Sequence, residues 1–378
     1  MELNLSKTKI VIFNKRGRLL KENVYFGECL VECVKTYKYL GLDFSNSGSF
    51  QLAIDNIKTK ARKACFKLKQ SVDPKSLQPK VAMNIFNSMV RPITLYGAEV
   101  WGAYLCCENF EKTLAKLEKL SIENVYIGYA KYILGVHKNT TNAAIRGELG
   151  IYPVGFEAIR SSINYNERLT HLPSQSLLAE ISNNNILQKT PWYIALNKFI
   201  TSLGHHKASD SKTIISTCKD LFREKWKEQI NSGGKLRTYA HFKNIFQYEN
   251  YLNDVHNVSH RRALTKLRTS SHGLHIETGR YTRPKVAPEN RICLLCNASV
   301  ENEAHFILHC SIYDEERTWL FKEIDKSCVN FASLDNDDKF QFLMSAEGCI
   351  VRAVASFCFH AFEKRKSHSL SYRLRNIS

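Results

Sequence analysis

Four residues with metal-binding side chains lie close together near the C-terminal end of the sequence. They are Cys293, Cys296, His305 and Cys310, in the spacing C-x2-C-x8-H-x4-C. Two cysteines separated by two residues can present both sulfurs to one ion, and the later histidine and cysteine can complete a tetrahedron. Three thiolates and one imidazole are a ligand set typical of structural Zn2+. The sequence therefore predicts one structural zinc ion.

The fourth ligand is open at this point, because two histidines lie in the second half of the cluster. His309 directly precedes Cys310 and could bind in place of His305. Either choice gives four protein ligands, which leave no coordination position for a catalytic water. We therefore expect the ion to stabilise a local fold rather than to carry out a reaction.

A basic segment runs from Arg261 to Arg291 and ends directly before the cluster. It carries eight Lys/Arg against two acidic residues, within a chain whose net charge is +18. Such a charge favours a polyanionic partner, and nucleic acid is the partner we expect. The candidate phosphate contacts are Arg261, Arg262, Lys266, Arg268, Arg280 and Arg283, with His272, His275 and Tyr281 as candidates for stacking on bases. The alternative is a solvated basic helix.

A second basic surface is predicted on an amphipathic helix that begins near Gln51. Apolar residues recur there at intervals of three and four, for example Ile54, Ile57 and Ala61. The opposite face carries Lys58, Lys60, Arg62 and Lys63, and then Lys67 and Lys69. This face is either simply solvated or lies along a phosphate backbone.

The fold class expected from the periodicity is mainly α with a small β-rich N-terminal segment (α+β). Strands are expected over residues 1–13, 28–35 and 37–44, where apolar residues alternate or run together. Helices are expected from Gln51 and from Pro79, and over 108–126, 157–169, 176–182, 191–202, 212–230, 314–326, 339–344 and 350–366. The last of these ends in Lys364-Arg365-Lys366, which could add phosphate contacts.

Composition also bears on the cell compartment. No apolar run approaches the roughly 18–20 residues that span a bilayer, and residues 1–14 lack the apolar region of a signal peptide. The cysteines outside the cluster are scattered irregularly, which favours reduced thiols over a disulfide framework. We expect a nuclear or cytoplasmic protein without a membrane partner, whose oligomeric state is open.

Several short segments follow one another in the order known from a protein family. They are Asn4-Leu5-Ser6-Lys7-Thr8-Lys9, Tyr37-Lys38-Tyr39-Leu40-Gly41, Tyr96-Gly97-Ala98-Glu99-Val100-Trp101-Gly102, Gly147-Glu148-Leu149-Gly150, Leu264-Thr265-Lys266-Leu267-Arg268, Ile276-Glu277-Thr278-Gly279-Arg280-Tyr281 and the Cys/His cluster. Over roughly residues 1–345 the chain resembles the C-terminal part of the reverse transcriptases of non-LTR (LINE-type) retrotransposons.

This resemblance implies an order of parts along the chain. They are the end of the polymerase palm (1–50), a thumb-like helical region (51–150), a helical linker (151–255), the basic segment with the zinc module (256–315) and a helical basic tail (316–378). Asn4 and Lys7 match the last palm strand, where the lysine lies close to the phosphates of the incoming nucleotide. Tyr39, Leu40 and Gly41 match the hairpin that supports the primer end, and we expect Tyr39 and Leu40 to serve in packing.

The resemblance also bears on catalysis. In the family, polymerisation depends on an aspartate early in the palm and on an Ala-Asp-Asp hairpin, which hold two Mg2+ ions. Both would lie before Asn4, so we expect this chain not to polymerise DNA and these matched residues to be vestigial. Two alternatives stay open: a zinc adaptor or regulator kept by the host, and a gene model that starts late in a full reverse transcriptase. An open reading frame upstream of Met1 that encodes the hairpin would favour the last.

A group of acids after the cluster invites comparison with an endonuclease site. Asp335, Asp337 and Asp338 are followed by Lys339, but the Pro-Asp pair that some related elements carry is missing. We expect a solvated loop at these residues.

Overall fold

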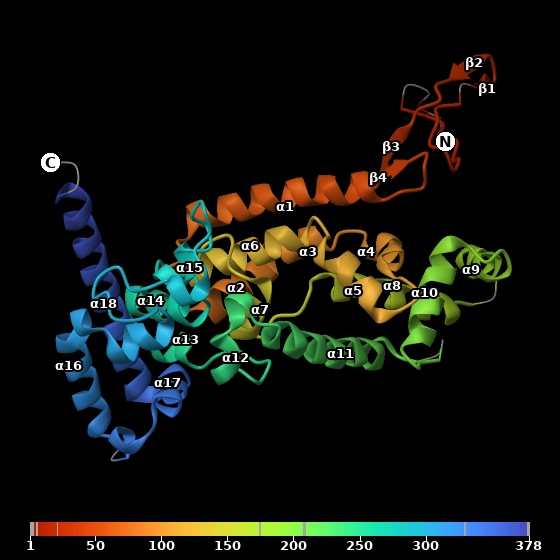
Figure 1. Cartoon of the computed structure of the whole chain (residues 1–378). Coiled ribbons are helices and arrows are strands. Elements are labelled where there is room, and N and C mark those ends of the chain that lie inside the picture. The colour runs from red at the N-terminus through yellow and green to blue at the C-terminus, as the bar shows by residue number, and fades with distance from the viewer. Residues whose placement is uncertain are drawn as a thin grey trace. The chain divides into compact units, whose positions relative to one another are not determined.

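The chain is mainly helical, with a small antiparallel β part near the N-terminus (Figure 1). The computed structural model describes residues 4, 7–20, 22–173, 175–206, 209–328 and 330–375, and their side chains except those of 185 and 369–375. This confirms the expected combination of many helices with few strands. Residues 1–3, 5 and 6 of the first expected strand lie outside the described residues.

The strands form two separate hairpins. β1 (Val24–Phe26) pairs with β2 (Cys29–Val31), and β3 (Thr36–Tyr39) pairs with β4 (Leu42–Ser45), both antiparallel. The single strand expected over 37–44 is therefore wrong. Leu40 and Gly41 both have positive φ, at 46° and 81°, which turns the chain tightly at the Tyr-Leu-Gly segment. Within the described part of 1–13, only Ile10 makes a β-bridge, to Cys33.

Helices make up most of the described structure, and several of them follow the apolar periodicity of the sequence closely. They are α1 (Gln51–Ser71), α2 (Pro79–Met89), α3 (Arg91–Thr94), α4 (Ala98–Trp101), α5 (Phe110–Glu118), α6 (Glu123–Leu134), α7 (Asn142–Leu149), α8 (Gly155–Thr170), α9 (Leu177–Leu187), α10 (Pro191–Ser202), α11 (Ser211–Asn231), α12 (Tyr239–Phe242), α13 (Tyr251–Asp254), α14 (Val258–Arg268), α15 (His275–Thr278), α16 (Asp314–Asp325), α17 (Asn336–Met344) and α18 (Gly348–Arg375). The helix expected over 108–126 is broken between α5 and α6, where no Gly or Pro announces the break.

The acids after the cluster lie at the start of a helix, which corrects the expectation of a loop. Asp335 is the N-cap of α17, and its side chain accepts a hydrogen bond from the backbone N–H of Asp338. Asp337 and Asp338 occupy the first turn, where negative charge is favourable. These carboxylates therefore have a local role in starting the helix.

The chain divides into two compact units. Unit 1 comprises Met1–Ser71, Ile85–Tyr126 and Pro153–Lys219, and unit 2 comprises Val72–Asn84, Ile127–Tyr152 and Asp220–Ser378. In unit 1, α8 packs against α4 and the following 3-10 turn Gly102–Leu105. In unit 2, the long helix α18 packs against α14, α16 and α13, and the Cys/His cluster belongs to this unit.

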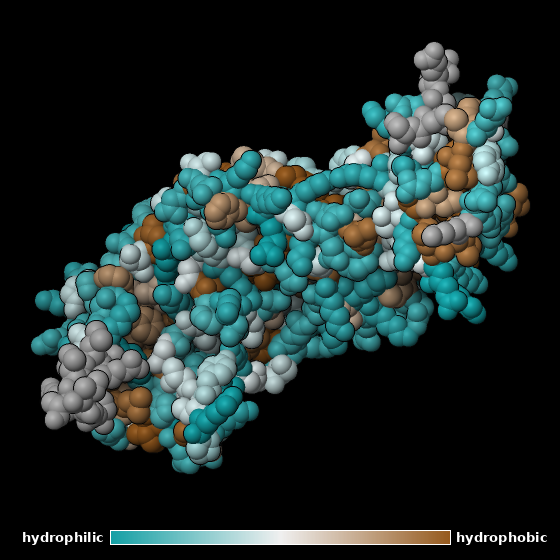
Figure 2. All heavy atoms as spheres, turned by 90° about the horizontal axis from the view of Figure 1, so that it is seen from above, coloured by the Kyte–Doolittle hydropathy of each residue, from teal (hydrophilic) through white to brown (hydrophobic). Residues whose placement is uncertain are grey.

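Apolar side chains are exposed on the two hairpins of unit 1. Figure 2 shows brown spheres gathered at the N-terminal segment, amid a surface that is otherwise largely hydrophilic. The exposed residues there include Phe13, Tyr25, Phe26, Leu30, Tyr39 and Leu40. Tyr39 and Leu40 are thus not packed within the described chain, which corrects the expectation made for them.

No single helix among the described residues has the length and apolarity needed to cross a lipid bilayer. α17 and the first part of α18 reach both only as a pair, bent by 101° at their junction. Phe340, Leu343 and Val354 of that pair are buried within unit 2.

Substitution of Gly102 tests the closest helix contact in unit 1. A Cβ at this position would collide with the carbonyl oxygen of Ala158 and lie 2.7 Å from Ser162 Oγ. We expect Gly102→Ala to cost about 1–3 kcal/mol of unfolding free energy through overpacking, measured by urea denaturation.

Gly128→Ala is the matched control: no heavy atom lies within 4 Å of its Cβ. It should be neutral or stabilise α6 by about 0.5–1 kcal/mol. Equal effects of the two variants would contradict the packing of α8.

Candidate metal centre

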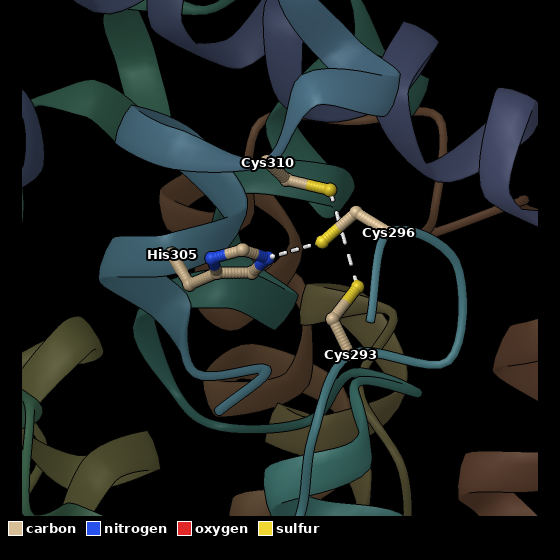
Figure 3. A group of neighbouring side chains, drawn as sticks. All are labelled: Cys293, Cys296, His305 and Cys310. Carbon is tan, nitrogen blue, oxygen red and sulfur yellow. Dashed lines mark hydrogen bonds between the residues drawn. The ribbon is translucent and has the colours of Figure 1, made fainter. Parts of the chain in front are cut away.

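The four residues of the Cys/His cluster converge on one point in unit 2 (Figure 3). Their ligand atoms all lie within 4.8 Å of one another. Cys293 Sγ is 3.9 Å from Cys310 Sγ, and Cys296 Sγ is 3.3 Å from His305 Nε2. Adjacent ligands of a tetrahedral zinc ion, at bond lengths of about 2.3 Å for sulfur and 2.0–2.1 Å for nitrogen, would be about 3.4–3.8 Å apart. The cluster could therefore hold a metal ion, and its spacing fits one zinc.

A tight turn brings the first two sulfurs together. The backbone N–H of Asn297 donates to the carbonyl of Cys293 at 3.0 Å, and Asn297 has a φ of +56°. Asparagine is one of the few residues with a side chain that tolerates this left-handed conformation. The N–H of Cys293 donates to the carbonyl of Ser299, and Ile292 makes an antiparallel bridge with Val300. The first half of the cluster is thus a small hairpin.

The second half is a π-helical turn over His305–His309. The N–H of Cys310 donates to the carbonyl of His305 at 2.8 Å, which closes the wide turn and directs both side chains to the hairpin. His309 is exposed and lies outside the group of converging side chains. The geometry therefore favours His305 over His309 as the fourth ligand.

The imidazole of His305 is oriented by a serine of the hairpin. Its Nδ1 lies 2.8 Å from Ser299 Oγ, while its Nε2 faces Cys296. A metal bound at Nε2 requires the proton on Nδ1, which then donates to the serine oxygen. Such a partner fixes the tautomer of a histidine ligand.

A buried arginine holds the end of the π-helical turn. Arg317 of α16 donates to the carbonyl oxygens of Ile307, at 3.1 Å, and of Cys310, at 2.6 Å. Its side chain also pairs with Asp314. The N–H of Cys310 is thus bound to His305, and its carbonyl oxygen is bound to Arg317.

The thiols of Cys293 and Cys310 are in hydrogen-bonding contact, with 3.9 Å between their sulfurs. A hydrogen bond from Cys310 lowers the pKa of Cys293 to about 2, and the same contact raises the pKa of Cys310. Glu301 Oε1 lies 3.6 Å from Cys293 Sγ. Burial raises the pKa of Glu301 to about 7, against the opposing effect of Arg365. One thiolate is thus already favoured, as a metal ligand requires.

Two glutamates connect the cluster to the rest of unit 2. Glu301 pairs with Arg365 of α18, and its Oε2 accepts from the N–H of His275 at 2.6 Å. Glu303 accepts from Arg237 Nη2 at 2.8 Å and lies 2.9 Å from His272 Nε2. Although burial opposes ionisation, the hydrogen bond and charge of His272 lower the pKa of Glu303 to about 2. The module is therefore anchored by ion pairs.

Two of the expected phosphate contacts are wrong, because their side chains are buried. Arg261 donates to the carbonyl oxygens of Val255 and Leu77, and Arg268 pairs with Glu148 and Glu249. Both guanidinium groups are enclosed by protein and satisfied there. A phosphate outside the chain cannot reach them, so they serve stability.

The other four candidates of the basic segment are more accessible. Arg262 and Lys266 are half-buried on α14, and Arg283 is exposed. Arg280 is half-buried, pairs with Glu277 and donates to the carbonyl of Gly234. Arg262, Lys266 and Arg283 thus remain candidates for phosphate contacts.

The three candidate stacking side chains also differ in how far they are exposed. The ring of His272 is enclosed and faces Glu303 and Phe362. His275 has its Nδ1 at 2.7 Å from the carbonyl oxygen of Ile292, in the cluster hairpin. Tyr281 is 63% exposed, with Lys235 Nζ 5.3 Å from the centroid of its ring.

The basic face of α1 is largely open to solvent. Lys60, Arg62 and Lys63 are exposed, whereas Lys58 is half-buried. Exposed Lys67 continues the face, and Phe66 lies beside it with 62% of its surface accessible. The helical periodicity predicts these cations, and the structure adds the exposed ring of Phe66 to the same face.

The residues matched to the reverse-transcriptase palm lie in unit 1. Asn4 and Lys7 are exposed, and Lys7 donates its backbone N–H to the carbonyl of Asn4. Gly41 lies in the β3–β4 turn, where Tyr96 Oη donates to the carbonyl of Leu40 at 2.5 Å. The described contacts give these residues a place in a turn and no ligand.

Comparison with known proteins adds no identification. No family model, curated protein or solved structure matches this chain. The likeness to reverse transcriptases therefore rests on the short segments of the sequence alone.

Proposed function

We propose that this chain is a non-catalytic nucleic-acid-binding protein, with a C-terminal module that is stabilised by one structural zinc ion. We further propose that it derives from the thumb, linker and zinc-binding parts of a non-LTR retrotransposon reverse transcriptase. The ordered sequence segments support this descent. Four protein ligands in the cluster support a structural ion, because they fill a tetrahedron.

The observation that carries nucleic-acid binding is the exposed face of α1. Lys60, Arg62, Lys63 and Lys67 form no ion pair with any residue that the structure describes. Asp55, in the helix's N-terminal part, is occupied by a hydrogen bond from Gln51. Four uncompensated cations along one helix repel one another, and a phosphate backbone relieves that repulsion while releasing its counterions. A solvated face would need no such concentration of one sign.

Removal of this charge should change the salt dependence of binding. We expect the variant Lys60→Gln/Arg62→Gln/Lys63→Gln/Lys67→Gln to bind RNA and DNA more weakly. The slope of log K against log salt concentration should flatten by about three units, because each phosphate contact contributes about 0.7–0.9. Fluorescence anisotropy with a labelled oligonucleotide, at several salt concentrations, measures the slope.

The control variant removes the same number of charges from exposed positions elsewhere. It is Lys119→Gln/Lys212→Gln/Lys227→Gln/Lys322→Gln, all at exposed positions. It should change the slope by less than about one unit. If both variants change it equally, binding depends on net charge alone and the face of α1 has no special part. If the wild-type chain binds neither RNA nor DNA, the proposed function is wrong.

A further inference from the structure

Two clefts in unit 2 adjoin each other. The larger, of about 660 Å³, lies between α14 and α18, and the smaller, of about 370 Å³, lies by the turn after α6. Ser271 and His272 line both clefts. The two clefts therefore adjoin at these residues, and we call the two clefts together the groove.

The larger cleft combines positive charge with apolar surface. Its lining includes the cations Arg262, Lys266, Arg365 and Lys366, against the single carboxylate of Glu363. Its apolar lining includes Phe359, Phe362 and Leu294. Leu294 lies between Cys293 and Cys296 in the cluster hairpin and is 59% exposed. The hairpin of the metal centre thus contributes an apolar side chain to the cleft.

Not all four cations carry free charge. Arg365 pairs with Glu301, and Lys366 pairs with Glu363. Among the described residues, Lys266 has no ion pair, and the side chain of Arg262 donates to the carbonyl of Lys75, at 3.0 Å. Burial, followed by the charges of Lys366 and Arg262, lowers the pKa of Lys266. The cleft therefore has an excess of positive charge that an anion would stabilise.

The smaller cleft offers an aromatic face and hydrogen-bonding groups. Lys235 lies over the ring of Tyr281, with 5.3 Å between Nζ and the ring centroid. Asn139 and Thr140 line the same space. An exposed ring beside a cation can receive a base and its phosphate together.

The middle of the groove is held rigidly by hydrogen bonds. Ser271 Oγ accepts from the N–H of His137 at 2.8 Å and lies 2.9 Å from Thr140 Oγ1. His272 is fixed by Glu303, two residues before the cluster's His305. The groove is thus formed before any ligand arrives, which lowers the entropic cost of binding.

We infer that this groove is a binding path for single-stranded nucleic acid, with a base on Tyr281 at one end and bases against Phe359 and Leu294 at the other. Arg262, Lys266 and Lys235 lie where they contact the intervening phosphates. A duplex keeps its bases stacked inside and cannot use these apolar faces, whereas a single strand exposes them. This inference rests on the proposed function and assigns it a second surface, separate from the face of α1.

Two single substitutions of the full chain test the path. Tyr281→Ala removes the exposed ring, and Lys266→Gln removes an unpaired cation. Each should weaken binding of a labelled oligo(dT) of about 12 nucleotides by about five- to fiftyfold, as expected when one stacked base or one phosphate contact is lost. Duplex DNA of the same length should bind the variants as it binds the wild type. Anisotropy titration at fixed salt gives the affinities.

Matched controls come from the same unit. Trp319→Ala removes another exposed aromatic ring, on α16, and Lys227→Gln removes an exposed cation on α11. Both should leave oligo(dT) affinity within about twofold. Circular dichroism of all four variants should match the wild type, because none of these side chains is fully buried.

The outcomes of these titrations distinguish a failure of the groove proposal from a failure of nucleic-acid binding as a whole. Wild-type affinity for oligo(dT) in both Tyr281→Ala and Lys266→Gln, with tight binding by the wild-type chain, would overturn the path and leave nucleic-acid binding intact. Displacement of the oligonucleotide by AMP at equal phosphate concentration would also overturn it, in favour of a mononucleotide site. A wild-type chain that binds no nucleic acid would overturn both proposals.

Discussion

Replacing Cys296 by serine is expected to release the zinc ion and to unfold the segment between Arg291 and Arg317. Cys296 is half-buried, so the loss of one sulfur costs little packing and the effect reports on the metal. Structural zinc contributes on the order of 10 kcal/mol of binding free energy in small modules, comparable with the stability of a whole domain. Arg317 and the ion pairs of Glu301 and Glu303 hold the hairpin and the π-helical turn from outside, whereas the ion would join the two directly.

The measurements are zinc content and the amide hydrogen exchange of residues 291–317. We expect zinc to fall well below one ion per chain and protection of this segment to be lost. Cys328→Ser is the control, since Cys328 is also a half-buried free thiol but does not belong to the cluster. It should keep both zinc and protection. A Cys296→Ser variant that behaves in the same way would show that the site has been assigned wrongly.

Replacing Arg268 by methionine is expected to destabilise unit 2 by about 3–5 kcal/mol, because it leaves a buried carboxylate unpaired. Glu148 and Arg268 are both almost fully enclosed. Arg268 contacts Glu148 at 3.0 Å and Glu249 at 2.5 Å, and also donates to the carbonyl of Met344. Tyr251 Oη donates to Glu148 at 2.5 Å, which is not enough to replace a guanidinium.

Guanidinium chloride denaturation of three variants measures this loss. Arg268→Met alone should show the full cost, and Arg268→Met/Glu148→Gln should recover a substantial part, because the unpaired charge is removed. Lys266→Met, on the same helix, should cost less than about 1 kcal/mol. A cost for Arg268→Met as small as that of Lys266→Met would contradict the buried ion pair.

The Glu148–Arg268 ion pair also determines how the stability of unit 2 changes with pH. Burial alone would raise the pKa of Glu148, but the charge and hydrogen bonds of Arg268 outweigh it and hold this pKa below its usual value. A carboxylate with a lowered pKa contributes stability above its unfolded value of about 4.5, and this is lost as the pH falls further. In Arg268→Met the contribution should be absent.

The cluster could be found from sequence because its residues are close along the chain. A spacing of C-x2-C-x8-H-x4-C leaves few ways to arrange four ligands, and only the choice between His305 and His309 needed the fold. The helix over 191–202 was likewise predicted at its observed bounds, since Pro191 marks its start. Signals of this kind come from residues that are close along the chain, so they can be recognised without the tertiary structure.

The burial of Arg261 and Arg268 was missed, although a signal was present. Counted along α14, these residues share a face with Leu264 at intervals of three and four. A basic side chain ordinarily favours an exposed position, which is why charge alone predicts the wrong environment for both residues. The acids that pair with Arg268 lie at positions 148 and 249, and no local pattern brings them together.

The groove depends on tertiary contacts throughout. Lys266 and Phe359 line one cleft because α18 packs against α14, and Tyr281, from a third segment, lines the adjoining cleft. The sequence predicts a basic tail at the end of α18. Its packing in unit 2, rather than its charge, gives it a place in the groove.

X-ray absorption spectroscopy at the zinc edge, on the purified full chain, tests the central claim most directly. We expect one zinc ion per chain, with three sulfur neighbours at about 2.3 Å and one nitrogen at about 2.0–2.1 Å. His305→Ala should remove the nitrogen neighbour, whereas His309→Ala should leave the spectrum unchanged. A first shell of oxygen atoms, or a chain that binds no zinc and forms a disulfide between Cys293 and Cys310, would contradict the account.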